Sequence, residues 1–320
     1  MPSRRRLLGL LTSVPAALLV SCAPSPVISG ASDPSAAPSP VEPTQSEEFA
    51  LAAAWVAGLQ ALAEELQANH DAWDTDAAAG SWAEAILEKC DALLDRLLAP
   101  DPLTSDQDPI FSVEEVGIPE SADLKGFHAQ LEEHSQAGIE LFGELSTAEA
   151  SQPERLLCAS LGCSAAGAVS FSRAPRADES KPIRFPDTSP DTSFGVALTH
   201  VWALIQGLEL ALDHLTDEDD KKRAATRLRD ARELRNDLRD EIAEEAPLQA
   251  ISYEFPGGTS SRDEIRAGLA ELETNLLDAL ARVVAASGEK AWYEAMIAQV
   301  SNVHSWGGSL TFWPGWAELD

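Results

Sequence analysis

Apolar residues recur every three or four positions along most of the chain, which is the spacing of one face of an α-helix. Eight such segments can be distinguished, and Ala, Leu and Glu are abundant while only two Tyr and nine Phe are present. This composition favours helices over strands. The sequence therefore predicts an all-α fold, with helices over about 47–69, 81–99, 121–145, 151–171, 193–215, 217–245, 261–286 and 289–305.

Several of these segments begin with residues that cap a helix. A Ser or Thr followed three positions later by Glu forms a capping box, and proline is tolerated in the first turn because its missing N–H needs no partner there. These signals place helix starts at Thr44 with Glu47, at Ser81 with Glu84, and at Ser151 with Pro153 and Glu154.

A proline-rich stretch divides the folded part. Residues 173–192 contain four prolines, which interrupt helices and mark a linker. We therefore expect a helical bundle over 47–172 and a four-helix bundle with an aromatic tail over 193–320. The helix over 193–215 is nearly apolar, but Glu209 and Asp213 favour a buried bundle helix over a membrane span.

The N-terminus has the pattern of an export signal. Arg4, Arg5 and Arg6 precede a 14-residue apolar stretch that ends at Val20, which is too short to span a membrane and typical of a signal peptide. Leu19-Val20-Ser21-Cys22 resembles the lipobox of bacterial lipoproteins. The resemblance implies that residues 1–21 are removed and that Cys22 receives a diacylglycerol. The basic residues also resemble the twin-arginine export motif, and a general secretory n-region is the alternative.

The segment that follows is predicted to be a tether. Residues 22–46 are rich in Pro, Ser and Ala, and such a composition cannot form a core. Loss of residues 1–21 removes three arginines and no acid, so the formal charge changes from −30 to −33. A surface this acidic repels nucleic acid and anionic headgroups. We expect a lipid-anchored protein on the extracytoplasmic face of the cell membrane, with no nucleic-acid partner.

The second half carries a family resemblance. A helical hairpin is followed by Tyr253-Glu254-Phe255-Pro256, a second Ala/Leu/Glu-rich hairpin, Trp306-Gly307-Gly308 and Phe312-Trp313-Pro314-Gly315. This order resembles a ferritin-like domain of unknown function in actinobacterial proteins, and the first half resembles, more weakly, the helical region that precedes such domains in lipoproteins. The resemblance covers 193 to about 317 and implies a ferritin-like four-helix bundle without a known activity.

A ferritin-like fold raises the question of a di-iron centre, which requires Glu-x-x-His on two helices. None of the six histidines, at 70, 128, 134, 200, 214 and 304, has a carboxylate three residues earlier. The core-facing positions of the last three helices read instead as Leu, Ala, Val and Ile. We therefore predict no metal and no cofactor, and we expect Glu209 to lie near the surface or to pair with an arginine such as Arg227 or Arg235.

Other candidate chemistry is weak. Gly162-Cys163-Ser164-Ala165-Ala166-Gly167 is one residue too long for a nucleophile elbow. The acidic run 217–220 lacks the ligand pattern of a calcium loop and fits the N-terminus of a helix. The tail residues Trp306, Trp313 and Trp316 either form a binding platform or seal one end of the bundle. No catalytic residue is predicted.

Three cysteines remain after Cys22. Cys158 and Cys163 are five residues apart on one predicted helix and point in different directions. A disulfide from Cys90 to Cys158 or Cys163 would join the second and fourth helices, and three buried free thiols are the alternative.

These observations leave three hypotheses for function. The first is a non-enzymatic, membrane-anchored binding or scaffold module with an unknown envelope protein partner. The second is a metal-handling ferritin-like protein with an atypical carboxylate site. The third, an enzyme with an unrecognised site, has no motif in its favour.

Overall fold

The computed structural model describes residues 43–104, 107–114 and 116–317. The predicted signal peptide, the lipidation site Cys22 and the tether up to residue 42 lie outside these residues. The described part is all-helical, as predicted, with a single isolated β-bridge between Arg176 and Thr311. Its helices are α1 (Glu47–Asn69), α2 (Ala77–Leu97), α3 (Leu124–Thr147), α4 (Gln152–Ala168), α5 (Pro190–His214), α6 (Glu218–Glu241), α7 (Arg262–Ser287) and α8 (Lys290–Ser305).

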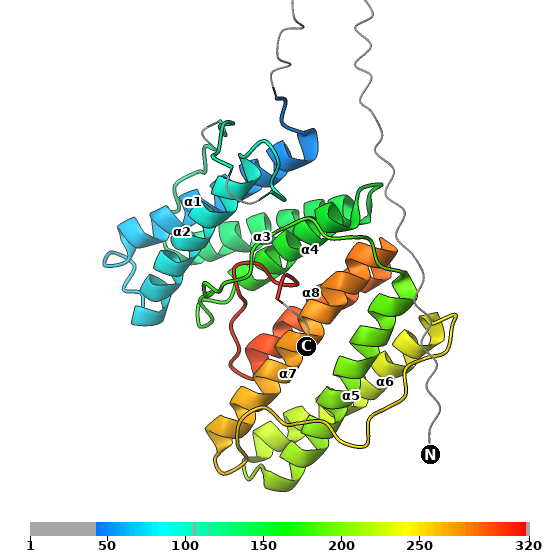
Figure 1. Ribbon diagram of the computed structural model, residues 1–320. Coiled ribbons are helices and arrows are strands. Elements are labelled where there is room, and N and C mark those ends of the chain that lie inside the picture. Colours follow the sequence, from blue (N-terminus) through cyan, green and yellow to red (C-terminus); the bar gives the residue numbers. More distant parts are fainter. Residues whose placement is uncertain (1–42, 105–106, 115, 318–320) are drawn as a thin grey trace, which may run out of the picture. The chain divides into compact units, whose positions relative to one another are not determined.

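The helices form four hairpins that pack side by side (Figure 1). In space the order is α1–α2, α3–α4, α7–α8 and α5–α6, because α4 contacts both α7 and α8 while α5 contacts α6 and α7. Residues from Thr44 onward belong to one compact unit, and their buried apolar side chains form one continuous core. Residues of both predicted bundles therefore contribute to one interior.

The segment predicted as a linker, 173–192, is tied to both halves. Arg184 donates its backbone N–H to the carbonyl of Leu103, and its side chain pairs with Asp101 at 3.0 Å. Arg176 donates to the carbonyl of Leu310 in the tail. The prolines do interrupt the helices, but the extended backbone they impose finds hydrogen-bond partners on the folded body. The last residues of this segment are already helical, since α5 begins at Pro190.

Helix caps account for the starts of α1 and α2, which differ from those predicted. Ser46 rather than Thr44 caps α1, and its hydroxyl accepts from the Phe49 N–H. Asp76 caps α2 by accepting from the Ala79 N–H, so that helix starts a full turn before Ser81. A carboxylate at the N-cap satisfies an orphan N–H as well as a hydroxyl does. The predicted capping box at Ser151 and Glu154 is confirmed at the start of α4.

Glycines allow the two halves to approach closely. The ring of Tyr293 on α8 lies against Gly143 and Gly162, on α3 and α4, where a Cβ would collide with it. Its hydroxyl donates to the carbonyl of Ile139 at 2.7 Å. A buried Tyr hydroxyl requires such a partner, so this contact fixes how α8 lies on the α3–α4 hairpin.

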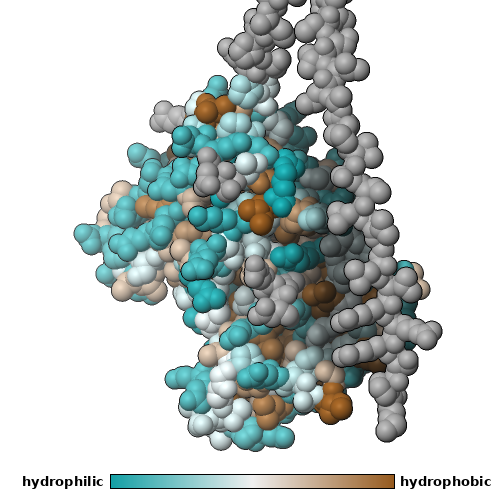
Figure 2. All heavy atoms as spheres, in the orientation of Figure 1, coloured by the Kyte–Doolittle hydropathy of each residue, from teal (hydrophilic) through white to brown (hydrophobic). Residues whose placement is uncertain are grey.

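Two helices, α1 and α5, are long and apolar enough to cross a membrane by length and composition, and half of each apolar window is buried within the fold. Both contribute to the shared core, which is the behaviour of core helices. On the face drawn in Figure 2, hydrophobic residues are scattered among hydrophilic ones. The most exposed large apolar side chains of the described residues, Leu248 and Ile251, lie on the loop between α6 and α7.

Candidate functional site

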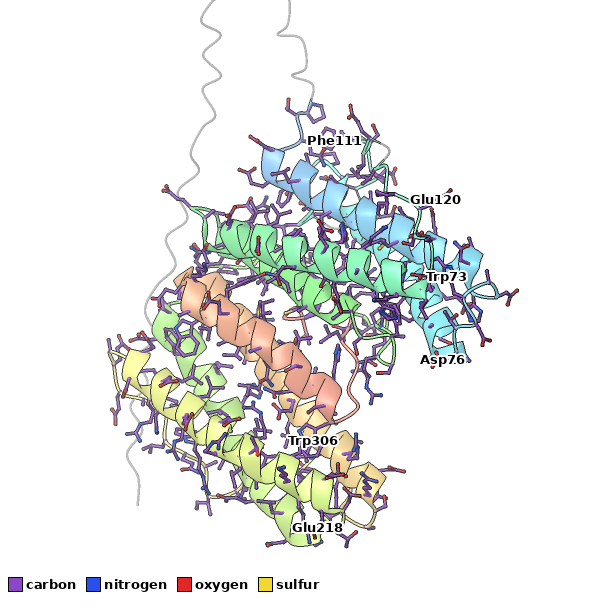
Figure 3. The ribbon with its side chains drawn as sticks, turned by 180° about the vertical axis from the view of Figure 1, so that it is seen from behind. Trp73, Asp76, Phe111, Glu120, Glu218 and Trp306 are labelled. Carbon is purple, nitrogen blue, oxygen red and sulfur yellow. The ribbon has the colours of Figure 1, made fainter. Side chains whose placement is uncertain are left out.

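A groove lies between α6 and α8 in the second half of the chain. Figure 3 shows these two helices with their side chains. These two helices do not pack closely against each other, although α5 packs on α6 and α7 packs on α8. The groove has a volume of about 660 Å³ and is open to solvent. It is lined by Asp219, Lys222, Arg223, Thr226, Arg227 and Asp230 from α6 and by Ser301, Asn302 and Ser305 from α8.

A buried ion pair lies beneath the groove. Arg227 donates from Nε to Glu273 Oε1 at 2.8 Å and from Nη2 to Glu273 Oε2 at 2.9 Å. The Glu273 side chain is fully buried and that of Arg227 is 9% exposed. Two parallel hydrogen bonds of this kind fix both groups in one geometry. Burying either charge alone would cost several kcal/mol, and the pairing offsets that cost.

Amide side chains of α8 complete this ion pair. Gln299 accepts from Arg227 Nη2 at 2.9 Å and donates to the backbone carbonyl of Glu273 at 2.9 Å. Asn302 donates to Gln299 Oε1 at 3.0 Å. These hydrogen bonds therefore join α6, α7 and α8, although α6 does not pack closely against α8.

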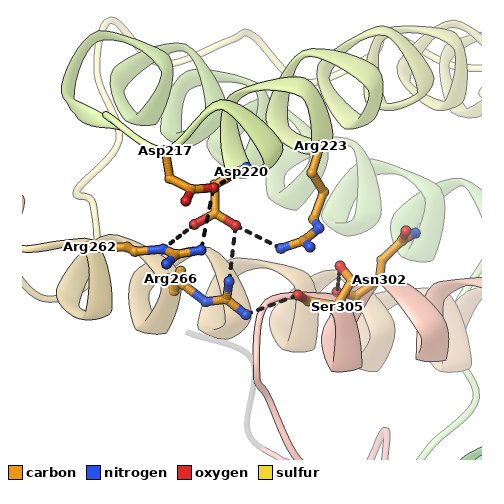
Figure 4. A network of polar contacts seen from close by, with 7 residues as sticks. All are labelled: Asp217, Asp220, Arg223, Arg262, Arg266, Asn302 and Ser305. Atoms are coloured by element: carbon orange, nitrogen blue, oxygen red, sulfur yellow. Dashed lines mark hydrogen bonds and ion pairs between the residues drawn. The ribbon is translucent and has the colours of Figure 1, made fainter.

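A second ionic cluster surrounds Asp220 and includes the groove residue Arg223 (Figure 4). Asp220 is fully buried and pairs with Arg223 at 2.9 Å, with Arg262 at 2.5 Å and with Arg266 at 3.0 Å. Burial alone would raise the pKa of Asp220, but the hydrogen bond from Arg262 and the charges of the three arginines outweigh it and lower the pKa. Asp220 is therefore an ionised anchor between α6 and α7.

The acidic run at 217–220 has the helix-terminal role that the sequence predicts, and one role more. Asp217 is the N-cap of α6, and its side chain accepts from the Asp220 N–H at 3.0 Å. Three acids follow in the first turn, where the helix dipole favours negative charge. The run also supplies Asp220, the buried carboxylate that binds three arginines. This role was not predicted from the sequence.

Glu209 lies at the surface, as predicted. Its carboxylate pairs with Arg232 of α6 at 2.7 Å, and the two side chains are 51% and 50% exposed. The expected partners were wrong: Arg227 is buried under the groove, and Arg235 donates to its neighbour Asn236. Glu209 and Arg232 bridge the hairpin near solvent, where the ion pair has little effect on stability.

The core-facing positions of α6 to α8 are not purely apolar, which corrects the expectation from their sequence. Glu273, Asp278 and Gln299 are all buried there. Glu273 lies four residues after Leu269 on the apolar stripe of α7, so its position on that stripe was the available signal. Among the described residues no group of three or more His, Cys, Asp or Glu is placed to hold a metal ion.

The three described cysteines are buried free thiols, so the disulfide from Cys90 to Cys158 or Cys163 is not formed in this structure. Burial raises the pKa of Cys90 and of Cys158 to about 12. Burial raises the pKa of Cys163 further. All three are therefore protonated near neutral pH and weakly nucleophilic.

The tryptophans of the tail are part of the core. Trp306, Trp313 and Trp316 are 2%, 5% and 7% exposed, so they pack against the helices and do not form an open platform. The guanidinium of Arg223 lies over the Trp306 ring at 5.3 Å from its centroid. This cation–π contact links the tail to the groove.

Two further buried ionisable groups lie outside the groove. Asp278 on α7 accepts from the Gly315 N–H at 2.6 Å, and burial raises its pKa to about 7. Lys89 on α2 is 2% exposed, and burial lowers its pKa to about 8. Nearby His304 has its pKa lowered to about 4, mainly by burial and then by the charges of Arg173 and Lys89. His200 has its pKa lowered by burial as well.

No protein family, curated protein or solved structure matches this chain in sequence or fold comparisons. The chemistry of the groove is therefore argued from its own residues.

Proposed function

We propose that the protein is an exported lipoprotein, anchored through Cys22 on the extracytoplasmic face of the membrane, whose folded part is a non-enzymatic binding or scaffold module. The signal peptide and lipobox pattern supports the anchor. The observation that carries the binding role is the α6–α8 groove, because its lining residue Arg227 is held in one orientation by hydrogen bonds to Glu273 and Gln299. A site that is ordered in advance loses less entropy on binding.

The groups under the groove favour binding over catalysis. The Glu273 carboxylate accepts from Arg227 and from Gln299, so its oxygens are engaged and it is poorly suited to act as a general base. Asp220 is likewise held among three arginines. Such pairs hold helices together, whereas a catalytic base needs a free lone pair within reach of the substrate.

We propose further that α5–α8 is a ferritin-like bundle. Its support is the connectivity: two hairpins are joined by the long connection 242–261 between α6 and α7, and ferritin-like folds have one such crossover. Three sides of the four-helix arrangement are packed, and the groove lies along the fourth, between α6 and α8. The buried charged groups include Glu273 and Arg227, and the guanidinium of Arg227 supplies the positive charge beside this carboxylate that a metal would supply elsewhere.

Membrane attachment is tested by cell fractionation. We expect Cys22→Ala to move the protein out of the membrane fraction or to leave it unprocessed, while the neighbouring control Ser25→Ala remains processed and membrane-bound. A processed Cys22→Ala protein that still fractionates with membranes would contradict the anchor.

The binding role and the alternative, metal handling, are separated by two measurements on protein purified from native membranes. Cross-linking followed by mass spectrometry should recover a reproducible envelope protein or ligand, and the absence of any would count against the binding module. Metal analysis should show iron and manganese well below one equivalent. Stoichiometric metal would favour the metal-handling function instead.

A further inference from the structure

The α6–α8 groove offers a fixed donor that the fold itself does not use. Glu273 engages Nε and Nη2 of Arg227, and within the described part of the chain Nη1 has no hydrogen-bond acceptor. Arg227 lines the groove, so the two N–H groups on Nη1 are left for a ligand there. The guanidinium cannot turn away, because its other edge is held by two hydrogen bonds in a planar fork.

A second guanidinium stands one helical turn away. Arg223 and Arg227 are four residues apart on α6 and therefore share a face of the helix. Arg223 uses Nη1 for Asp220, and its side chain is 38% exposed toward the groove that it lines. Lys222 also lines the groove. Each guanidinium can donate hydrogen bonds to the oxygens of a phosphate or carboxylate.

The opposite wall is neutral and polar. Ser301, Asn302 and Ser305 of α8 line it, and they suit the hydroxyl or amide groups of a small ligand. Asp219 and Asp230 also line the groove on the α6 side. Together with the formal charge of −30, these two acids disfavour a long polyanion such as nucleic acid and favour a compact ligand with one anionic group.

We propose that the groove between α6 and α8 binds the phosphate or carboxylate group of a small ligand through Arg227 and Arg223. This inference rests on the proposed binding function and gives that site its ligand chemistry. A free metabolite and a lipid headgroup would present the same group to the two arginines, so the experiment distinguishes these sources.

The test uses calorimetry on the full mature chain with inorganic phosphate and acetate as probes, at constant ionic strength set with chloride. We expect saturable binding of at least one probe. Thr226 is exposed and lines the groove, so Thr226→Glu should place a carboxylate beside the arginines and weaken binding tenfold or more. The matched control Ala225→Glu adds the same charge at an exposed neighbouring position outside the groove and should bind within twofold of the unmodified protein.

The source of the anion is tested with vesicles. The Cys22→Ala chain, which lacks the predicted anchor, is mixed with vesicles that contain or lack a phosphomonoester lipid. Binding that requires this lipid and is lost in Thr226→Glu identifies a headgroup, and phosphate or acetate binding without vesicle binding identifies a free ligand. Failure of both probes and of the vesicles, or equal losses in Thr226→Glu and Ala225→Glu, would overturn the proposal. Membrane fractionation and cross-linking are independent of these results, so the proposed function can fail or hold separately.

Discussion

The two halves of the described chain differ in the charged side chains that they bury. The interior of α1–α4 is mostly Leu and Ala, with aromatic contacts in which the Trp55 ring stacks on His134 and meets Phe142 edge-on. The interior of α5–α8 is mostly Leu, Ala and Val, but it also contains the ionised groups Asp220, Arg227 and Glu273. The first half is held by packing and the second by packing together with directed charge pairs.

The two halves also differ in whether their buried charges are paired. In the second half Arg227 and Glu273 compensate each other, and the pairs connect helices that do not pack closely. In the first half the charge of Lys89 is buried without a carboxylate among the described residues that forms a salt bridge to it. Paired charges are costly to break, whereas an unpaired one is costly to keep. Removal of one charge from the Arg227–Glu273 pair should therefore destabilise the protein, whereas removal of the unpaired charge of Lys89 should stabilise it.

The largest loss is expected from Glu273→Ala. Removal of this carboxylate leaves the Arg227 guanidinium buried and unpaired, which destabilises a protein by about 3–5 kcal/mol. Urea unfolding should show this decrease in the free energy of unfolding. The control Glu271→Ala, two residues earlier on the exposed face of α7, should change it by less than about 0.5 kcal/mol.

A double substitution sharpens the same comparison. Arg227→Met with Glu273→Leu replaces the ion pair by apolar groups, and such replacements are often neutral or stabilising. The double variant should recover most of the stability lost in Glu273→Ala. A double variant as unstable as the single one would show that the fold needs the pair for more than charge compensation.

Asp278→Asn should remove a pH-dependent loss of stability. Because burial raises the pKa of Asp278 from 3.8 to about 7, the folded protein holds a proton that the unfolded chain releases between these values. Stability from this group therefore falls as pH rises from about 4 to about 7, by roughly 4 kcal/mol in total. The asparagine keeps an acceptor for the Gly315 N–H and should not show this fall.

The measurement for Asp278 is the melting temperature between pH 4 and pH 8. The exposed control Asp237→Asn on α6 should keep the slope of the unmodified protein. If Asp278→Asn also keeps that slope, the carboxyl of Asp278 is ionised in the fold throughout this range, which would contradict the effect of burial.

Lys89→Met should stabilise the first half. Burial lowers the pKa of Lys89 from 10.5 to about 8, so the unfolded chain binds a proton more readily than the folded one between these values. Stability from this group therefore rises with pH from about 8 to about 10.5, and at pH 7 the full penalty of roughly 3 kcal/mol is present. Cys90 would oppose the shift only as a thiolate, and its own pKa is raised to about 12.

Chemical denaturation at pH 7 and pH 10 checks the effect of Lys89. Lys89→Met should be more stable than the unmodified protein at pH 7, and the difference should shrink at pH 10. Lys125→Met, at an exposed position of α3, is the matched control and should show neither effect. A loss of stability in Lys89→Met at pH 7 would indicate that the charged lysine has a compensating partner.

The helical periodicity predicted every helix, because amphipathic spacing records which face is buried regardless of what covers it. The capping box at Ser151 was predicted for the same local reason, whereas α2 starts earlier because Asp76 offers an equally good cap. The shared core was not predicted. Whether 173–192 separates two bodies depends on contacts such as Tyr293 with Ile139, which are 154 residues apart and leave no local pattern.

The groove was missed for a related reason. Glu273 and Arg227 each appear in the sequence as a charged residue on a highly charged helix, and only the packing of α7 against α5 and α8 makes Glu273 an interior residue. Its place on the apolar stripe of α7 was a usable signal. The partner of Glu209 was misassigned because Arg227, Arg232 and Arg235 all lie on α6, and the rotation of α6 about its axis decides which of them faces Glu209.

The smallest effect on stability is expected for an ion pair of a glutamate and an arginine that is exposed to solvent. Glu209 and Arg232 pair at 2.7 Å, a distance close to that of Arg227 and Glu273, but both side chains are about half exposed. Water and salt screen such a pair, so a double-mutant cycle of Glu209→Ala and Arg232→Ala should give a coupling energy below about 1 kcal/mol. The coupling should fall further between 0.05 M and 0.5 M salt as the screening length shortens. A cycle at Arg227 and Glu273 should give several times that coupling with little salt dependence. Equal couplings at the two sites would show that burial does not set the strength of these ion pairs.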